Sequence, residues 1–221
     1  MTIIVLMNRF LLLIALFLMP TAGHADYFFW QDPETKLSIT FPDTWKKQHN
    51  QGPNDILTII APSDHGWPQC TVKTKEDKRY TIYPSQYGDD IQREAVSVPF
   101  WHDYMGAYDA YTLNTVYDGS GLGRWLASYA YATYDNRNGT AHEKRRALMF
   151  ASLYYDTLYI VECSALNHAY DKWDNDFRSI IKSIDFKKAF HEHKHGEYHN
   201  FLTDADLHFW SQTSPAGSTT Y

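Results

Sequence analysis

The chain has 221 residues and carries 26 Asp and Glu against 20 Lys and Arg, which gives a net charge of −6 with histidine neutral. An acidic chain without a basic stripe argues against a nucleic acid partner. The length predicts one domain of ordinary to large size once an N-terminal leader is set aside.

The first 25 residues have the order of a secretory signal peptide. Arg9 precedes an apolar run from Phe10 to Met19, and small residues then lead to Ala25, after which cleavage is expected. An uncleaved membrane anchor is the alternative, although the run from Phe10 to Met19 alone is too short to span a bilayer. Because no later apolar stretch reaches that length, we expect a periplasmic or secreted protein with no membrane span after cleavage.

Three strand patterns follow the leader, at residues 36–41, 56–61 and 71–73. The first alternates apolar and polar side chains, and the second is a β-branched run bounded by turn residues. Between these two strands, residues 42–45 predict a turn with room for one helical turn.

The middle of the chain changes from helical to β patterns. Residues 84–110 predict one or two short helices, with Pro99 as an interruption. Four strand patterns then cover 110–117, 124–134, 144–154 and 158–163. Asp118-Gly119 is a strong hairpin signal in the first connection, because glycine takes a positive φ without steric cost. The short connections predict an antiparallel meander.

A helix closes the folded part of the sequence at residues 169–184. Apolar side chains recur there every three or four residues, which marks one buried helix face, and Ser164 or Asn167 is the expected cap. The predicted fold is therefore α+β, an antiparallel sheet of about six strands covered by helices. We expect a domain at 26–186 and a histidine-rich tail at 187–221.

Two stretches resemble the PsbP-like and DcrB-like proteins. The first is LSITFPDTWK at 37–46; the second combines YIVECSA at 159–165 with FRSIIKSIDF at 177–186. Together they bracket residues 36–186. The resemblance implies an α/β/α sandwich around an antiparallel sheet, in a family whose members are often exported and many of which bind or assemble without catalytic residues. It supplies no site residue that can be carried over.

Cys70 and Cys163 are the only cysteines. In an oxidising compartment an even pair indicates one disulfide, which here would close a loop of about 93 residues. Two buried free thiols are the alternative. A catalytic thiol–disulfide pair is disfavoured because the chain has no C-x-x-C spacing.

Aromatic residues of the irregular middle region form a candidate ligand groove. Its main residues are Trp101, Tyr104 and Tyr108, since amphipathic rings suit such grooves. Further candidates for the same groove are Trp67, Tyr83, Tyr87 and Tyr111. The alternative is that these rings pack between helices and sheet.

The C-terminal tail contains the candidate metal ligands His191, His193, His195 and His199. Neutral imidazole binds Zn(II), Cu(II) and Ni(II), so a divalent transition metal is a possible cofactor. The pattern lacks the H-E-x-x-H of a catalytic zinc helix. A solvated charged tail is the alternative.

The leading functional hypothesis is a non-enzymatic exported binding or assembly protein, whose partner is an unknown protein or small molecule. The second is a metal-binding protein that acts through the histidine-rich tail. The third is a hydrolase with an unrecognised site, although no G-x-S-x-G is present. Residues 119–123 are rich in glycine but are followed by a strand, which favours a hairpin loop over a phosphate loop.

Overall fold

The computed structural model describes residues 26–49, 52–62, 66–83, 87–138 and 141–188. The leader at 1–25 and the histidine-rich tail from residue 189 onward lie outside these ranges. Within them, no helix is long and apolar enough to cross a membrane.

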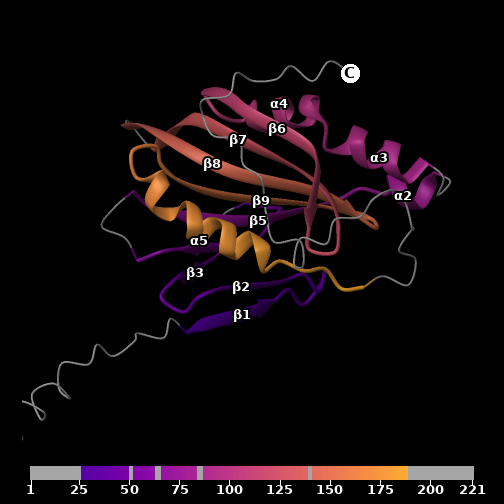
Figure 1. The fold of residues 1–221 in the computed structure, drawn as a ribbon, viewed down its shortest axis with the longest axis horizontal. Coiled ribbons are helices and arrows are strands. Elements are labelled where there is room, and N and C mark those ends of the chain that lie inside the picture. The colour runs from indigo at the N-terminus through magenta and orange to yellow at the C-terminus, as the bar shows by residue number, and fades with distance from the viewer. Residues whose placement is uncertain (1–25, 50–51, 63–65, 84–86, 139–140, 189–221) are drawn as a thin grey trace, which may run out of the picture.

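A seven-stranded antiparallel sheet is the centre of the described fold (Figure 1), with the strand order β3-β4-β5-β9-β8-β7-β6. Its strands are β3 (Lys46–Gln48), β4 (Asp55–Ile60), β5 (Gln69–Glu76), β6 (Ala110–Leu122), β7 (Trp125–Asn138), β8 (Ala141–Tyr154) and β9 (Thr157–Leu166). A separate sheet pairs β1 (Tyr27–Gln31) with β2 (Ser38–Pro42). This confirms the predicted α+β class with a larger sheet than the six strands expected.

Helices cover both faces of the large sheet (Figure 1). On one side lie α2 (Arg79–Ile82), α3 (Gly88–Ala95) and α4 (Val98–Met105), and on the other lies α5 (Tyr170–Lys182). Helices α3 and α4 are the short helices predicted at 84–110, whereas α2 was not predicted. Strand β9 is buried along nearly its whole length because it is central and covered on both faces. Its side chains alternate, so Glu162 and Ser164 point to the α4 side, and Val161 and Cys163 point to the α5 side.

The closing helix buries the face that its spacing predicted. Phe177, Ile180 and Ile181 are buried, and Trp45 packs edge-on against Phe177 and Trp173 with ring centroids 6.2 and 6.0 Å apart. The predicted cap was wrong. Helix α5 has Ala169 at its N-cap position and no side-chain cap; Ser164 lies within β9, and Asn167 lies two residues before the N-cap position.

The first strand and the turn after it differ from the prediction. The strand predicted at 36–41 is present as β2, but it pairs with β1, a strand that was not predicted, outside the seven-stranded sheet. Residues 43–45 form a turn that leads into β3, and the helical turn expected there is absent. The buried Trp45 packs against Phe177 of α5, and its backbone N–H donates to the carbonyl of Pro42 in a single turn before β3 begins at Lys46.

The hairpin turn between β6 and β7 was predicted at the wrong glycine. Strand β6 continues through Asp118 and Gly119, which form an irregularity in the ladder, and the chain reverses at Gly123 between the paired residues Leu122 and Trp125. Gly123 has φ +58°, and a Cβ there would lie 3.1 Å from Asp185 Cα. The turn is therefore placed by its contact with the segment after α5, which local sequence does not reveal.

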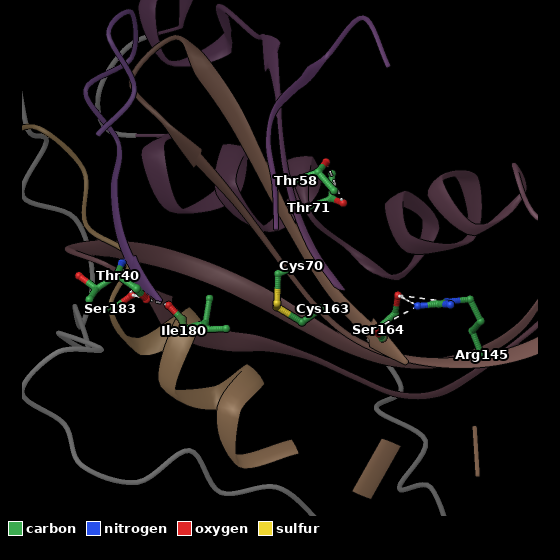
Figure 2. The surroundings of a disulfide bond; sticks show 9 residues. All are labelled: Thr40, Thr58, Cys70, Thr71, Arg145, Cys163, Ser164, Ile180 and Ser183. Carbon is green, nitrogen blue, oxygen red and sulfur yellow. Dashed lines mark hydrogen bonds between the residues drawn. A yellow bond between two sulfur atoms is a disulfide. The ribbon is translucent and has the colours of Figure 1, made fainter. Parts of the chain in front are cut away.

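The predicted disulfide joins Cys70 of β5 to Cys163 of β9 (Figure 2). The two residues lie directly opposite each other in neighbouring strands, with their Cα atoms 4.0 Å apart. Both are buried on the side that α5 covers. The bond links an early strand to the last strand of the sheet.

Candidate functional site

The three residues of the predicted groove occupy different surroundings. Trp101 is fully buried in α4, and its indole N–H donates to Ser128 Oγ at 2.9 Å. Ser128 in turn donates to the carbonyl of Val96 at 2.6 Å. Trp101 therefore anchors α4 to β7, whereas Tyr104 and Tyr108 reach a different polar group.

That group is Glu162, a carboxylate near the middle of β9 with only 5% of its surface exposed. Its Oε2 accepts hydrogen bonds from the hydroxyls of Tyr104 at 2.6 Å and Tyr108 at 3.0 Å. Its Oε1 accepts from Tyr134 at 2.7 Å and from Tyr108 at 3.1 Å. Three tyrosines from α4, the loop after it and β7 thus converge on one buried acid.

Lys73 of β5 completes what we call the Glu162 cluster: Glu162, Tyr104, Tyr108, Tyr134 and Lys73. The ammonium lies 3.9 Å from Glu162 Oε2 and donates to the Tyr104 hydroxyl at 2.9 Å. It also lies 5.0 Å from the centre of the Tyr104 ring. A buried carboxylate requires such partners, because an isolated charge is costly to remove from water.

The tyrosines of the cluster are strong donors that hold their protons. Burial raises the pKa of Tyr104, Tyr108 and Tyr134, and the negative charge of Glu162 raises each pKa further. At Tyr134 the positive charge of Arg145 opposes this increase, but the pKa of Tyr134 is still raised overall. Because all three hydroxyls remain protonated, each can donate to the carboxylate across the neutral pH range.

Arg145 extends the polar network along the same face of the sheet. It is buried opposite Tyr134 in the β7–β8 ladder. Its guanidinium donates to Ser164 Oγ and O at 3.1 Å (Figure 2). It also donates to the carbonyl of Trp67 at 2.8 Å. Arg145 therefore fixes the start of β5 and the end of β9 through neutral acceptors.

The geometry makes the Glu162 cluster a clamp between helix and sheet. Both carboxylate oxygens are engaged by donors from the protein itself, so the acid is already satisfied. The described residues contain no group of three or more His, Cys, Asp or Glu that could hold a metal ion. The cluster links β5, β7 and β9 to α4 and its following loop.

The remaining members of the predicted groove lie elsewhere. Tyr111 contacts His102, with 3.0 Å between its hydroxyl and Nδ1, and Trp67, Tyr83 and Tyr87 are exposed. A ligand groove at Trp101, Tyr104 and Tyr108 stays a prediction. His191, His193, His195 and His199 lie outside the described residues, so the metal site also stays a prediction.

Sequence reasoning missed Glu162, Tyr134 and Lys73. One signal was present: Glu162 is the single charged residue in the otherwise apolar run YIVECSA. A charge in the centre of a buried strand requires partners from other elements. The sequence does not identify those partners, because Tyr104 lies 58 residues away and Tyr134 lies 28 residues away.

Among the residues that the structure describes, three consecutive exposed aromatic side chains lie on strand β1, whose sequence is YFFWQ. Tyr27, Phe28 and Phe29 are 59%, 53% and 61% exposed. Because neighbouring strand residues point to opposite faces, apolar rings are exposed on both sides of β1. We call the β1–β2 pair with these three rings the aromatic ribbon. It lies at the outer edge of the molecule, beyond α5 and β3 (Figure 1).

No protein-family model matches the chain, and neither does any curated protein sequence. Among solved structures, the chain is similar to PsbP of the cyanobacterium Synechocystis, with 12% identity, TM-score 0.47, and coverage of 76% of this chain and 97% of that one. It is also similar to LpqN of Mycobacterium tuberculosis, involved in cell envelope biogenesis, with 10% identity, TM-score 0.48, and coverage of 75% and 93%.

A third similar structure is the Ran-binding protein Mog1p of Saccharomyces cerevisiae, with 4% identity, TM-score 0.44, and coverage of 73% of this chain and 96% of that one. The structure of PsbP is thus one of those to which this chain is similar.

Proposed function

We propose that the chain is a non-enzymatic binding or assembly protein that works outside the cytosol and uses the aromatic ribbon as its contact surface. The observation that carries the proposal is the exposure of three consecutive aromatic side chains, Tyr27, Phe28 and Phe29. Exposed large apolar groups gathered on one element are typical of interaction sites.

The state of the Glu162 cluster supports a binding role. A general acid or base must reach the proton that it transfers, whereas the Glu162 oxygens accept from Tyr104, Tyr108 and Tyr134 inside the fold. These bonds hold α4 against the sheet. The hydrogen bonds of Glu162 therefore serve to hold the fold together, which suits a protein that presents a fixed surface.

A photo-crosslinking amino acid at Phe29 tests this function in exporting cells. We expect a discrete adduct with one partner when the probe replaces Phe29. The control places the same probe at Ile82, which is 70% exposed on α2 at a distance from the ribbon in the sequence. Equal labelling from both positions, or none from either, would contradict the proposal.

Export is the second part of the proposal. The leader pattern of residues 1–25 supports it, and the Cys70–Cys163 disulfide is typical of proteins in oxidising compartments. Mass spectrometry of the protein recovered from the periplasm or medium should find Asp26 as its first residue. Recovery only from the cytosol with the leader intact would contradict export.

The histidine-rich tail supports a second candidate function, metal binding. Five histidines fall within the 18 residues from His191 to His208, and such tracts bind transition metals. Calorimetric titration with Zn(II) should give binding in the full chain and none in a chain ending at Phe186. Unchanged affinity after truncation would remove the tail from the function.

A further inference from the structure

The two sheets have four edge strands, β1, β2, β3 and β6. Among the residues described, β1 is the edge strand that has no feature blocking it from pairing with another strand. Strand β3 is short and carries Lys46 and Lys47, and β6 is interrupted by two register shifts. The outer edge of β2 is bonded by Ser183 and Asp185. Lysines, irregularities and covering segments are the usual ways of blocking strand pairing at an edge.

Strand β1 has the opposite properties. It pairs with β2 through five consecutive residues without a register shift, and its sequence contains no charge and no proline. A regular, uncharged, apolar edge is the form that invites pairing with another strand. The exposed rings of Tyr27 and Phe29 lie on one face of this edge, and that of Phe28 lies on the other.

The backbone groups of β1 that face outward follow from the ladder. The amide of Asp43 donates to the carbonyl of Asp26, and that of Asp32 donates to the carbonyl of Leu37. In an antiparallel pair these bonded positions alternate, so Phe28 and Trp30 also bond toward β2. The N–H and C=O groups of Tyr27, Phe29 and Gln31 therefore point to the free edge.

Charge around the ribbon restricts the occupant. Asp26 and Asp43 are both exposed and lie together at the start of β1. A second copy paired antiparallel through all five β1 residues would set Asp26 opposite Asp32 at each end, and like charges directly opposite are destabilising. A segment with a basic residue at this end would instead meet two carboxylates.

We propose that β1 binds an extended segment of a partner protein as a third strand of the β1–β2 sheet. The segment carries apolar side chains at alternate positions and a basic residue at the end beside Asp26 and Asp43. Backbone hydrogen bonds to Tyr27, Phe29 and Gln31 supply the pairing, as in other cases of strand addition. This inference rests on the proposed function and specifies the class of its partner.

Two variants at one position separate strand pairing from ring contact. Phe29→Ala removes the ring and keeps the outward N–H, whereas Phe29→Pro removes both and leaves the bonds to β2 intact. The probe is a fluorescent peptide with alternating valine and threonine followed by two lysines. We expect the proline variant to bind it roughly 3–10-fold more weakly than the alanine variant, the effect of one lost hydrogen bond. Equal affinities would overturn strand addition.

Tyr27→Pro compared with Tyr27→Ala repeats the test at a second outward N–H, should Phe29→Pro fail to fold by circular dichroism. A peptide with two glutamates in place of the lysines should bind more weakly; equal binding would overturn the basic partner. Two further measurements test a membrane surface and a second copy of the chain as the occupant: sedimentation with phosphatidylcholine vesicles and analytical ultracentrifugation. If the unchanged protein binds vesicles or forms a dimer, and the alanine and proline variants both lose this property equally, strand addition would be overturned. A specific cross-link at position 29 with equal peptide affinities would leave the proposed function standing and reject only the pairing mode.

Discussion

Glu162 illustrates how one residue organises several elements. The side chain is buried, carries a charge, and is stabilised by three tyrosine hydroxyls and Lys73. Removing one member of a buried charged network leaves its partners without hydrogen bonds or a counter-charge, and this lowers the stability of the fold strongly. The loss is larger than the stability that the intact network adds relative to apolar side chains of the same size. Glu162 therefore helps to hold α4 on the sheet, beside the hydrogen bond from Trp101 to Ser128.

Glu162→Gln should lower the free energy of unfolding by about 2–4 kcal/mol, because Lys73 loses its counter-charge and the amide nitrogen meets a hydroxyl donor. Urea unfolding followed by circular dichroism measures the difference. Glu34→Gln is the matched control, since Glu34 is exposed, and it should change stability by less than about 0.5 kcal/mol. A similar effect of both substitutions would argue against the clamp.

The cluster also predicts a loss of stability at alkaline pH. Burial and the charge of Glu162 raise the pKa of Tyr108 in the folded protein, whereas the pKa of a tyrosine in the unfolded chain is about 10. The contribution of protonated Tyr108 to stability is fully present below about pH 10. It is lost as the pH rises above this value, because the unfolded chain releases the tyrosine proton while the folded chain keeps it. Melting temperatures measured from pH 8 to 11 should fall less steeply for Tyr108→Phe than for the unchanged protein. Tyr83→Phe, at an exposed tyrosine, should leave the slope as it was; parallel curves for all three proteins would refute the effect.

At the scale of elements, the β6–β7 hairpin depends on a contact with a distant segment. Gly123 adopts a positive φ where a Cβ would lie 3.1 Å from Asp185 Cα and from the carbonyl oxygen of Ile184. Arg124 reinforces the contact by donating from Nε to Asp185 at 3.0 Å. The turn thus joins the sheet to the end of α5.

Gly123→Ala should destabilise the protein by about 1–3 kcal/mol, through left-handed strain and the crowding of backbone atoms that cannot move aside. Gly119→Ala is the matched control in the same hairpin. Its new Cβ would meet the Tyr117 hydroxyl at 3.0 Å, the far end of a side chain that can turn away. Thermal unfolding compares the two, and an equal loss in both would show that the Asp185 contact does not decide the turn.

For the whole molecule, the disulfide connects parts that are far apart in the chain. Cys70 and Cys163 are separated by 93 positions, and the intervening chain includes α2, α3, α4 and strands β6 to β8. The bond therefore restricts the unfolded chain over a long loop and joins the N-terminal strands to β9. Removing it should affect global unfolding more than any local feature.

Replacing both cysteines, as Cys70→Ala with Cys163→Ala, should lower the free energy of unfolding by up to ~4.5 kcal/mol in the chain-entropy account. Denaturant titration under oxidising conditions measures the loss. Reductant should destabilise the unchanged protein and leave the double variant unaffected. A double variant as stable as the oxidised protein would mean that packing of β5 on β9 alone supplies the stability.

Sequence periodicity by itself determined the fold class, the meander and the buried face of α5, because these depend on neighbours in the chain. Residue chemistry and the expected compartment likewise predicted the Cys70–Cys163 pair. The tertiary structure alone decided the Gly123 turn, the pairing of β1 with β2, and the partners of Glu162. Each of these depends on contacts between distant segments, whose energies local patterns do not contain: an apolar strand such as YFFWQ has the same pattern whether its rings are buried or remain exposed at an edge.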